Sequence, residues 1–261
     1  MENVANRLGF VLDQLAIVEP RDCPTHGPFQ SRKCKLADRE IWTPCPECMA
    51  EEGRKNVQDQ EQQRLKAQSA AIMAGALIPQ RFMARTLDNY RADLPGQQAA
   101  LRVAREYAEH FDDCLASGRS LVFCGTAGTG KTHLAVGIAK RVIDMGKSAT
   151  FTTAMDAIRR VRETYRKGSE KTERQVIEEF ALADLTIIDE VGSQLGTDAE
   201  KVTLFDLINA RYERERPMIV MSNLTLKEVE QYMGTRAFDR LRENGGQAVT
   251  FTWDSYRKVQ P

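Results

Sequence analysis

A glycine-rich octapeptide in the middle of the chain restricts its fold more than any other feature. The octapeptide consists of Gly125, Thr126, Ala127, Gly128, Thr129, Gly130, Lys131 and Thr132, and it matches the P-loop pattern G-x-x-x-x-G-K-[ST]. It follows the apolar stretch 121–124 and opens a helical pattern over 130–145. Glycines let the backbone N–H groups curl toward phosphate oxygens, and a helix N-terminus adds partial positive charge. A glycine-rich turn without a ligand is the alternative, but the flanking strand and helix favour a phosphate site.

A second apolar stretch, residues 185–188, ends in two carboxylates, Asp189 and Glu190. We expect Lys131 to reach the phosphates of ATP or ADP, and Thr132 and Asp189 to hold Mg²⁺. Glu190 would polarise the attacking water as the general base, which makes the chain an ATPase. An acidic pair after a strand can also be a simple helix cap. Together with the P-loop, the catalytic interpretation is favoured.

Beyond Pro79, strand patterns and helical patterns alternate as far as residue 252. This alternation predicts an α/β fold with a parallel sheet flanked by helices. The 261 residues suffice for one such domain and a small appendage. We expect four regions: an amphipathic helix over 1–19, a zinc-binding module over 20–50, a helical linker over 51–78 and the ATPase domain over 79–261.

Two closely spaced ligand pairs mark the appendage: Cys23 with His26, and Cys45 with Cys48. Each short spacing lets one turn present two ligands to a single tetrahedral Zn²⁺. Metal binding would supply folding energy that so small a region cannot obtain from a core. Cys34 is a fifth candidate that could replace His26 or be free, and disulfides or inert thiols are the alternatives to zinc.

Composition narrows the classes of partner. Lys plus Arg and Asp plus Glu both number 37, so the net charge is zero, which argues against coating nucleic acid through overall charge. The N-terminus has no signal-peptide pattern, and the longest nearly apolar run, 70–78, is too short to span a membrane. A cytoplasmic protein without a membrane partner is therefore expected.

One local stretch could nevertheless bind DNA. Residues 159–167 place several cations around Tyr165, and a basic groove with a stacking aromatic suits sequence-tolerant binding of single strands. Arg160, Tyr165 and Arg166 are the candidate DNA contacts. A solvated helix face with Tyr165 packed inward is the alternative.

The order of further motifs completes a family pattern. Ser222-Asn-Leu is followed by Arg236-Ala-Phe-Asp-Arg-Leu-Arg and by Phe251-Thr-Trp-Asp-Ser-Tyr-Arg. With the P-loop and Asp189-Glu190, this order resembles the DnaC/DnaI-type helicase loaders over residues 79–258. The C-terminal motif is similar to the DnaC branch and its prophage relatives, whereas a zinc module is typical of DnaI-type and phage loaders. The resemblance implies an AAA+ ATPase that engages the hexameric, DnaB-type replicative helicase and places it on single-stranded DNA.

The resemblance also implies roles for single residues. Asn223 would contact the γ-phosphate or the attacking water, although Asn is also a common turn former. Arg240 would be the arginine finger that reaches the neighbouring subunit's nucleotide, which implies self-assembly. Arg257 would be a sensor-like contact. Arg236, Arg242 and Arg257 compete with Arg240 for the finger, and a surface ion pair is the alternative for each.

Several alternatives stay open. The helix bearing Tyr165 corresponds to a DNA-contacting helix of the DnaC-like family, but residues 196–199 lack an aromatic that relatives carry there. The zinc module, with the apolar face of residues 4–18, would dock on the helicase, or that face could pack on its own protein. An IstB-like transposition helper acting on duplex DNA is the second function considered. A metabolic P-loop kinase is the third, and Asp189-Glu190 argues against it.

Overall fold

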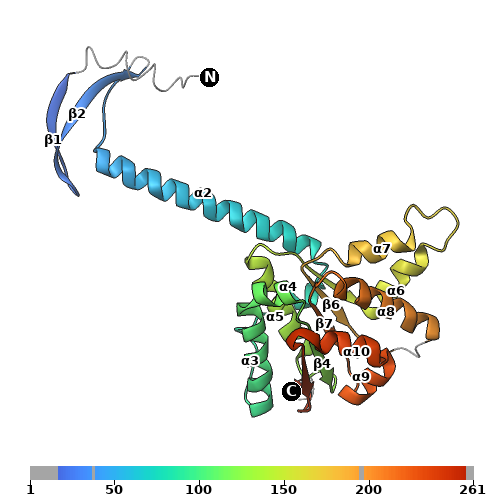
Figure 1. The fold of residues 1–261 in the computed structure, drawn as a ribbon. Helices are drawn as coiled ribbons and strands as arrows, with labels where there is room; N and C mark the ends of the chain where they lie inside the picture. The colour runs from blue at the N-terminus through green and yellow to red at the C-terminus, as the bar shows by residue number, and fades with distance from the viewer. Residues whose placement is uncertain (1–16, 37–38, 194–196, 257–261) are drawn as a thin grey trace. The chain divides into compact units, whose positions relative to one another are not determined.

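The computed structural model describes residues 17–36, 39–193 and 197–256. The chain divides into two compact units, Met1–Lys66 and Ala67–Pro261. Figure 1 shows the elements of both units, and each unit is described by itself.

The first unit holds a small antiparallel sheet of order β1-β2-β3. Its strands are β1 (Val18–Cys23), β2 (Gly27–Leu36) and β3 (Arg39–Trp42). Cys23 ends β1 opposite Gly27, so the tight turn between these strands carries His26. The helix predicted over 1–19 falls outside the described residues except at its end, where the prediction is wrong because Val18 and Glu19 pair in β1.

Helix α2 (Pro46–Gly75) continues from the first unit into the second and has no buried residue. Within the second unit, Ile72 and Met73 at its end pack against the core. The chain then leaves the helix, and the carbonyl of Ala76 accepts a 2.8 Å hydrogen bond from the N–H of Phe151. The helix predicted for the linker over 51–78 therefore begins earlier, at Pro46 inside the predicted zinc module, and ends at Gly75.

The second unit is built on a parallel five-stranded sheet of order β5-β6-β7-β4-β8. Its strands are β4 (Leu121–Gly125), β5 (Ala149–Thr153), β6 (Leu185–Asp189), β7 (Met218–Met221) and β8 (Gln247–Phe251). The predicted α/β class is confirmed. This order places the carboxyl ends of β6 and β7 next to the end of β4, where the P-loop begins.

Helices cover both faces of this sheet, because alternate side chains of a buried strand point to opposite sides. Leu121 and Phe123 of β4 belong to one core cluster, and Val122 and Cys124 belong to the other. The helices are η1 (Gln80–Phe82), α3 (Pro95–Glu109), α4 (Phe111–Ser117), α5 (Lys131–Asp144), α6 (Ala154–Glu163), α7 (Glu173–Phe180), α8 (Asp198–Tyr212), α9 (Leu226–Met233), α10 (Thr235–Arg242) and η2 (Glu243–Gly245).

Helices α3, α4 and α5 supply the first cluster, whereas α8, α9 and α10 supply the second. Helices α3 and α4 are separated by a break at His110, and Gly118 in the left-handed conformation ends α4. A search of the described residues finds no helix that could cross a membrane.

Candidate nucleotide and metal sites

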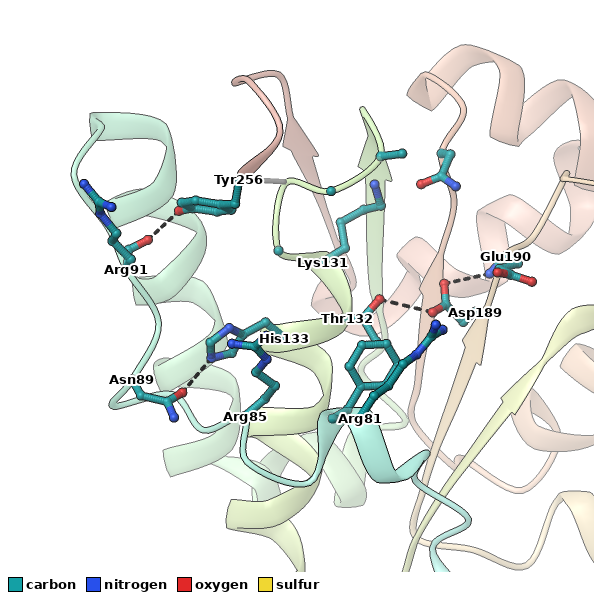
Figure 2. Close-up of a pocket in the computed structure, with 15 residues that line it drawn as sticks. Arg81, Arg85, Asn89, Arg91, Lys131, Thr132, His133, Asp189, Glu190 and Tyr256 are labelled. Atoms are coloured by element: carbon teal, nitrogen blue, oxygen red, sulfur yellow. Dashed lines mark hydrogen bonds between the residues drawn. The ribbon is translucent and has the colours of Figure 1, made fainter. Parts of the chain in front are cut away.

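The P-loop connects β4 to α5 and forms one wall of a cavity of about 380 Å³ (Figure 2). Fifteen residues line this cavity: Arg81, Phe82, Arg85, Asn89, Arg91, Ala127, Gly128, Gly130, Lys131, Thr132, His133, Asp189, Glu190, Asn223 and Tyr256. The structure therefore brings the predicted P-loop, Asp189, Glu190 and Asn223 to one place. They converge because β4, β7 and β6 are neighbours whose carboxyl ends share one edge of the sheet.

The side chain of Lys131 folds back onto the P-loop. Its Nζ donates hydrogen bonds to the carbonyls of Gly125 at 2.7 Å and Thr126 at 2.8 Å. Burial lowers the pKa of Lys131 from 10.5 to about 8, although the charge of Asp189 opposes this shift. Because the cation has only neutral carbonyls as direct partners, an anionic phosphate entering the loop would stabilise its charge.

Thr132 and Asp189 form an oxygen-donor pair suited to Mg²⁺. The hydroxyl of Thr132 donates to Oδ2 of Asp189 at 3.2 Å. Burial raises the pKa of Asp189, so its carboxylate is incompletely compensated in this setting. Mg²⁺ is bound in proteins through one or two such oxygen ligands plus substrate phosphates and water. These two side chains therefore fit the ion, which would offset the charge of nucleotide phosphates beside them.

Glu190 and Asn223 both line the cavity; Glu190 directly follows β6, and Asn223 lies two residues beyond the end of β7. The backbone of Glu190 is left-handed, with φ of 62°, a conformation that is unfavourable for a residue with a side chain. Its N–H donates to Oδ1 of Asp189 at 2.7 Å, which ties the two carboxylate residues together. Residues in such conformations cluster at functional sites, and Glu190 lines the cavity in this one.

The cavity also contains three arginines that no motif marks in the sequence. Arg81, Arg85 and Arg91 line it from η1 and the segment before α3, and Tyr256 of the C-terminal motif lines it from the end of the domain. The guanidinium of Arg81 lies 4.6 Å from the centre of the Phe82 ring. Arg91 is ion-paired with Asp93, whereas Arg81 and Arg85 add positive charge to the cavity beside Lys131, which suits binding of a polyphosphate. Only their folding onto the P-loop reveals them, because no spacing rule marks them in the sequence.

Arg240 lies elsewhere. Its guanidinium carbon is 4.8 Å from the ring centre of Phe205 and 5.1 Å from that of Tyr212, an aromatic pair on α8. Its Nη1 is buried and has no hydrogen-bond partner among the described residues. Arg240 lines a separate small cavity and does not face the P-loop of its own chain. Arg257, the predicted sensor-like contact, lies outside the described residues.

The DNA-contact candidates lie around the end of α6. The Tyr165 side chain is 62% exposed, and its hydroxyl donates to Glu173 at 3.0 Å. Neighbouring Arg159 and Arg162 pair with Asp156 and Glu200. Arg160 and Arg166 are exposed, and neither makes an ion pair within the described part of the chain. An outward-facing ring with unpaired cations is therefore observed, and the inward-packed alternative for Tyr165 is wrong.

The four predicted zinc ligands come together in the first unit. The ligand atoms of Cys23, His26, Cys45 and Cys48 all lie within 4.8 Å of one another. Cys23 Sγ is 3.5 Å from Cys48 Sγ, and His26 Nδ1 is 3.3 Å from Cys48 Sγ. A tetrahedral Zn²⁺ with Zn–S bonds of about 2.3 Å needs sulfurs about 3.8 Å apart. The cluster therefore has the composition and size of a Cys₃His zinc site. The side chain of Cys34 lies outside the described side chains.

The groups around the four ligands also support a zinc site. The other ring nitrogen of His26 lies 3.2 Å from the carboxylate of Glu51, as metal-bound histidines usually require. Backbone N–H groups of Thr25 and His26 lower the pKa of the Cys23 thiol to about 6. The hydrogen bond to Cys23 raises the pKa of Cys48 to about 12, and burial and repulsion from the charge of Cys23 act in the same direction. A divalent cation among these ligands removes that conflict.

The chain has relatives among known proteins. The model of the family described as IstB-like ATP binding protein matches residues 60–260. The replicative helicase loader DnaC of Escherichia coli (strain K12) is 36% identical over 172 residues, which cover 66% of this chain and 69% of the loader. The uncharacterized protein YdaV of the same strain is 28% identical over 265 residues, covering 100% of this chain and 98% of that protein.

The fold is similar to that of a solved structure, the crystal structure of the DnaC helicase loader, with a TM-score of 0.58 and 22% identity. The match covers 66% of this chain and 99% of the loader chain. At this identity the likeness supports the fold alone, a P-loop domain built on a parallel sheet. The family match extends over most of the chain and includes the P-loop, Asp189 and Asn223. The chain therefore belongs to the IstB/DnaC family of ATP-binding proteins.

Proposed function

We propose that this protein is an ATP-dependent loader of the hexameric replicative helicase onto single-stranded DNA. The observation that carries the proposal is the convergence of Lys131, Thr132, Asp189, Glu190 and Asn223 on one basic cavity in a chain homologous to DnaC. The relative DnaC is a replicative helicase loader, and a protein that binds and releases its partner under control of a nucleotide needs this kind of site.

In this proposal ATP binds with its phosphates inside the P-loop. Lys131 exchanges the carbonyls of Gly125 and Thr126 for phosphate oxygens. Thr132 and Asp189 hold Mg²⁺, which supplies charge neutralisation when it is bound. Glu190 orients and deprotonates the attacking water, and Asn223 positions the water or the γ-phosphate. Hydrolysis then acts as a switch.

Arg240 would complete the site of a neighbouring subunit. An arginine finger stabilises charge that develops on the transferred phosphoryl group. In the single chain the guanidinium rests between the rings of Phe205 and Tyr212. Assembly would therefore have to replace these cation–π contacts, each worth about 0.5–1 kcal/mol at a partly exposed site, with contacts to a nucleotide.

Single-stranded DNA would bind around Tyr165. Its exposed ring can stack on a base, and the unpaired guanidinium groups of Arg160 and Arg166 can contact phosphates. The zinc-binding unit would contact the helicase. It is the part of the chain that the ATPase chemistry does not need, and its strand β2 exposes the polar side chains of Gln30 and Arg32.

Co-sedimentation with the replicative helicase of the host tests the proposal. We expect the chain to migrate with the helicase in the presence of ATP, and Glu190→Gln to retain the complex while losing about 10²-fold or more in hydrolysis rate. Lys131→Ala should lose ATP binding and Cys45→Ser should lose the helicase. Failure to associate in every nucleotide state, together with ATP-dependent assembly on duplex DNA, would instead favour an IstB-like transposition helper.

A further inference from the structure

The outer face of the P-loop is held by residues that no nucleotide-binding motif includes. The carbonyl of Thr129 accepts a hydrogen bond from the indole Nε1–H of Trp253 at 3.0 Å. It also accepts one from the hydroxyl of Tyr90 at 3.4 Å. Thr129 is fully buried, and Trp253 and Tyr90 are only 9% and 6% exposed. Two nearly buried side-chain donors thus converge on one carbonyl of the loop.

The backbone of the P-loop makes further hydrogen bonds to the C-terminal segment. The carbonyl of Gly128 accepts from the N–H of Tyr256 at 3.0 Å, and the N–H of Thr126 donates to the carbonyl of Phe251 at 3.0 Å. In contrast, the N–H groups of residues 127–130 have no hydrogen-bond partner within the described ranges. The carbonyls of Gly128 and Thr129 are thus bonded to residues outside the loop, whereas the N–H groups of residues 127–130 stay available, and this arrangement can receive an anion.

Two glycines allow the rings of Tyr90 and Trp253 to pack this close to the loop. Gly130 has φ of 98°, and a Cβ there would lie 2.6 Å from the Tyr90 ring. A Cβ on Gly96 would lie 3.2 Å from the Trp253 ring. Both aromatic rings therefore approach glycines closely, and the position of each donor relative to the loop is fixed by packing.

We propose that Trp253 and Tyr90 are positioning residues of the nucleotide site. By holding the Thr129 carbonyl on the outer side of the P-loop, they keep the loop N–H groups directed toward the phosphates. Neither side chain lines the cavity itself, so both act through the backbone of the loop. The proposal rests on the proposed ATP binding and adds the residues that pre-organise it.

Conservative variants test this role. Trp253→Phe keeps an aromatic ring but loses the indole N–H, and we expect ATP and ADP to bind about three- to tenfold more weakly, with kcat at saturation unchanged. Tyr90→Phe should weaken binding about twofold, because its bond is longer. In the double variant the buried carbonyl loses both donors, so the loss should exceed the product of the single effects.

Tyr107→Phe is the matched control. The Tyr107 hydroxyl is fully buried and donates to the carbonyl of Arg119 at 2.8 Å, in another part of the same core. Its loss should lower Tm as the Trp253 variant does, with no change in ATP affinity. Equal ATP affinity in wild type, Trp253→Phe and the double variant would overturn the proposal.

A spectroscopic measurement adds an independent readout. Trp42 and Trp253 are the two tryptophans of the chain, so Trp42→Phe leaves Trp253 as the single reporter beside the P-loop. ATP should shift its emission, and Lys131→Ala should abolish the shift. Tight ATP binding without a change in emission would contradict the positioning role alone, whereas a wild-type chain that binds no ATP would overturn the proposed function as well.

Discussion

Among the described residues of the first unit, only Cys23, Ser31 and Cys45 are buried, and two of these three belong to the ligand cluster. The second unit instead buries residues from every strand of its sheet in two large clusters. The buried residues of the first unit are therefore mostly metal-ligand candidates, whereas those of the second unit form a hydrophobic core. A short chain segment can therefore acquire a defined fold through four side chains, whereas a nucleotide site with a pre-organised loop requires a packed sheet beneath it.

The largest effect is expected from breaking the ligand cluster. Cys45→Ser should abolish zinc binding and unfold the strands of the first unit, because structural zinc contributes on the order of 10 kcal/mol to small domains. Zinc content per chain and circular dichroism would measure this. Cys34→Ser is the control, and we expect it to retain a full equivalent of zinc. Loss of zinc in this control would contradict the assigned Cys₃His set.

A core mutation in the second unit should have the opposite effect, lowering stability without removing zinc. Phe123 is fully buried in β4, and Phe123→Ala should lower the free energy of unfolding by about 3–5 kcal/mol through lost contacts and the cavity left behind. Denaturant unfolding measures the change. Zinc content should stay at the wild-type value. If it fell together with the stability of the second unit, the two regions would not be stabilised separately.

The pH dependence of ATP binding tests the role of Lys131 in the second unit. Lys131 has a pKa of about 8 in the free protein, and bound phosphate raises it. Below about pH 8 the lysine is already charged, so affinity should not depend on this group. Above that pH, binding takes up a proton and the Kd should rise up to about tenfold per pH unit. Calorimetry from pH 7 to 9.5 checks this, and an unchanged Kd would contradict it.

The smallest effect concerns DNA. Arg160→Ala should weaken binding of single-stranded DNA about fivefold at low salt and reduce the salt dependence by about one phosphate contact. Arg159→Ala is the matched control, since Arg159 is already paired with Asp156. Fluorescence anisotropy with an oligonucleotide measures both. Equal losses in the two variants would mean that the effect is one of net charge only.

The sequence predicted the elements whose patterns are local. Three features depend only on residues close in sequence: the P-loop spacing, the apolar strand before Asp189, and the Cys and His pairs. All three are found in the structure where they were expected. The strands of the first unit were not predicted. Five of the six residues of β1 are exposed, so the alternation that marks a half-buried strand is missing.

Residues whose role depends on distant partners also escaped prediction. Arg211 lies in the last turn of α8 and resembles a surface cation, yet it is fully buried. It donates to the carbonyls of Phe180, Ala183 and Pro217. Burial lowers its pKa from 12.5 to about 9. Trp253 likewise meets Thr129 across 124 positions of sequence, a contact that only the parallel pairing of β4 with β8 creates.

The two tryptophans permit the most direct test of the difference between the units, because Trp42 ends β3 and Trp253 lies against the P-loop. Emission would be followed in the Trp42→Phe and Trp253→Phe variants while a chelator removes zinc. ATP affinity would be measured in the wild-type chain before and after the same treatment. We predict that the Trp42 signal changes, the Trp253 signal does not, and the Kd for ATP stays within about twofold. A Trp253 response to the chelator, or loss of ATP binding with the metal, would contradict separate stabilisation by metal and by core.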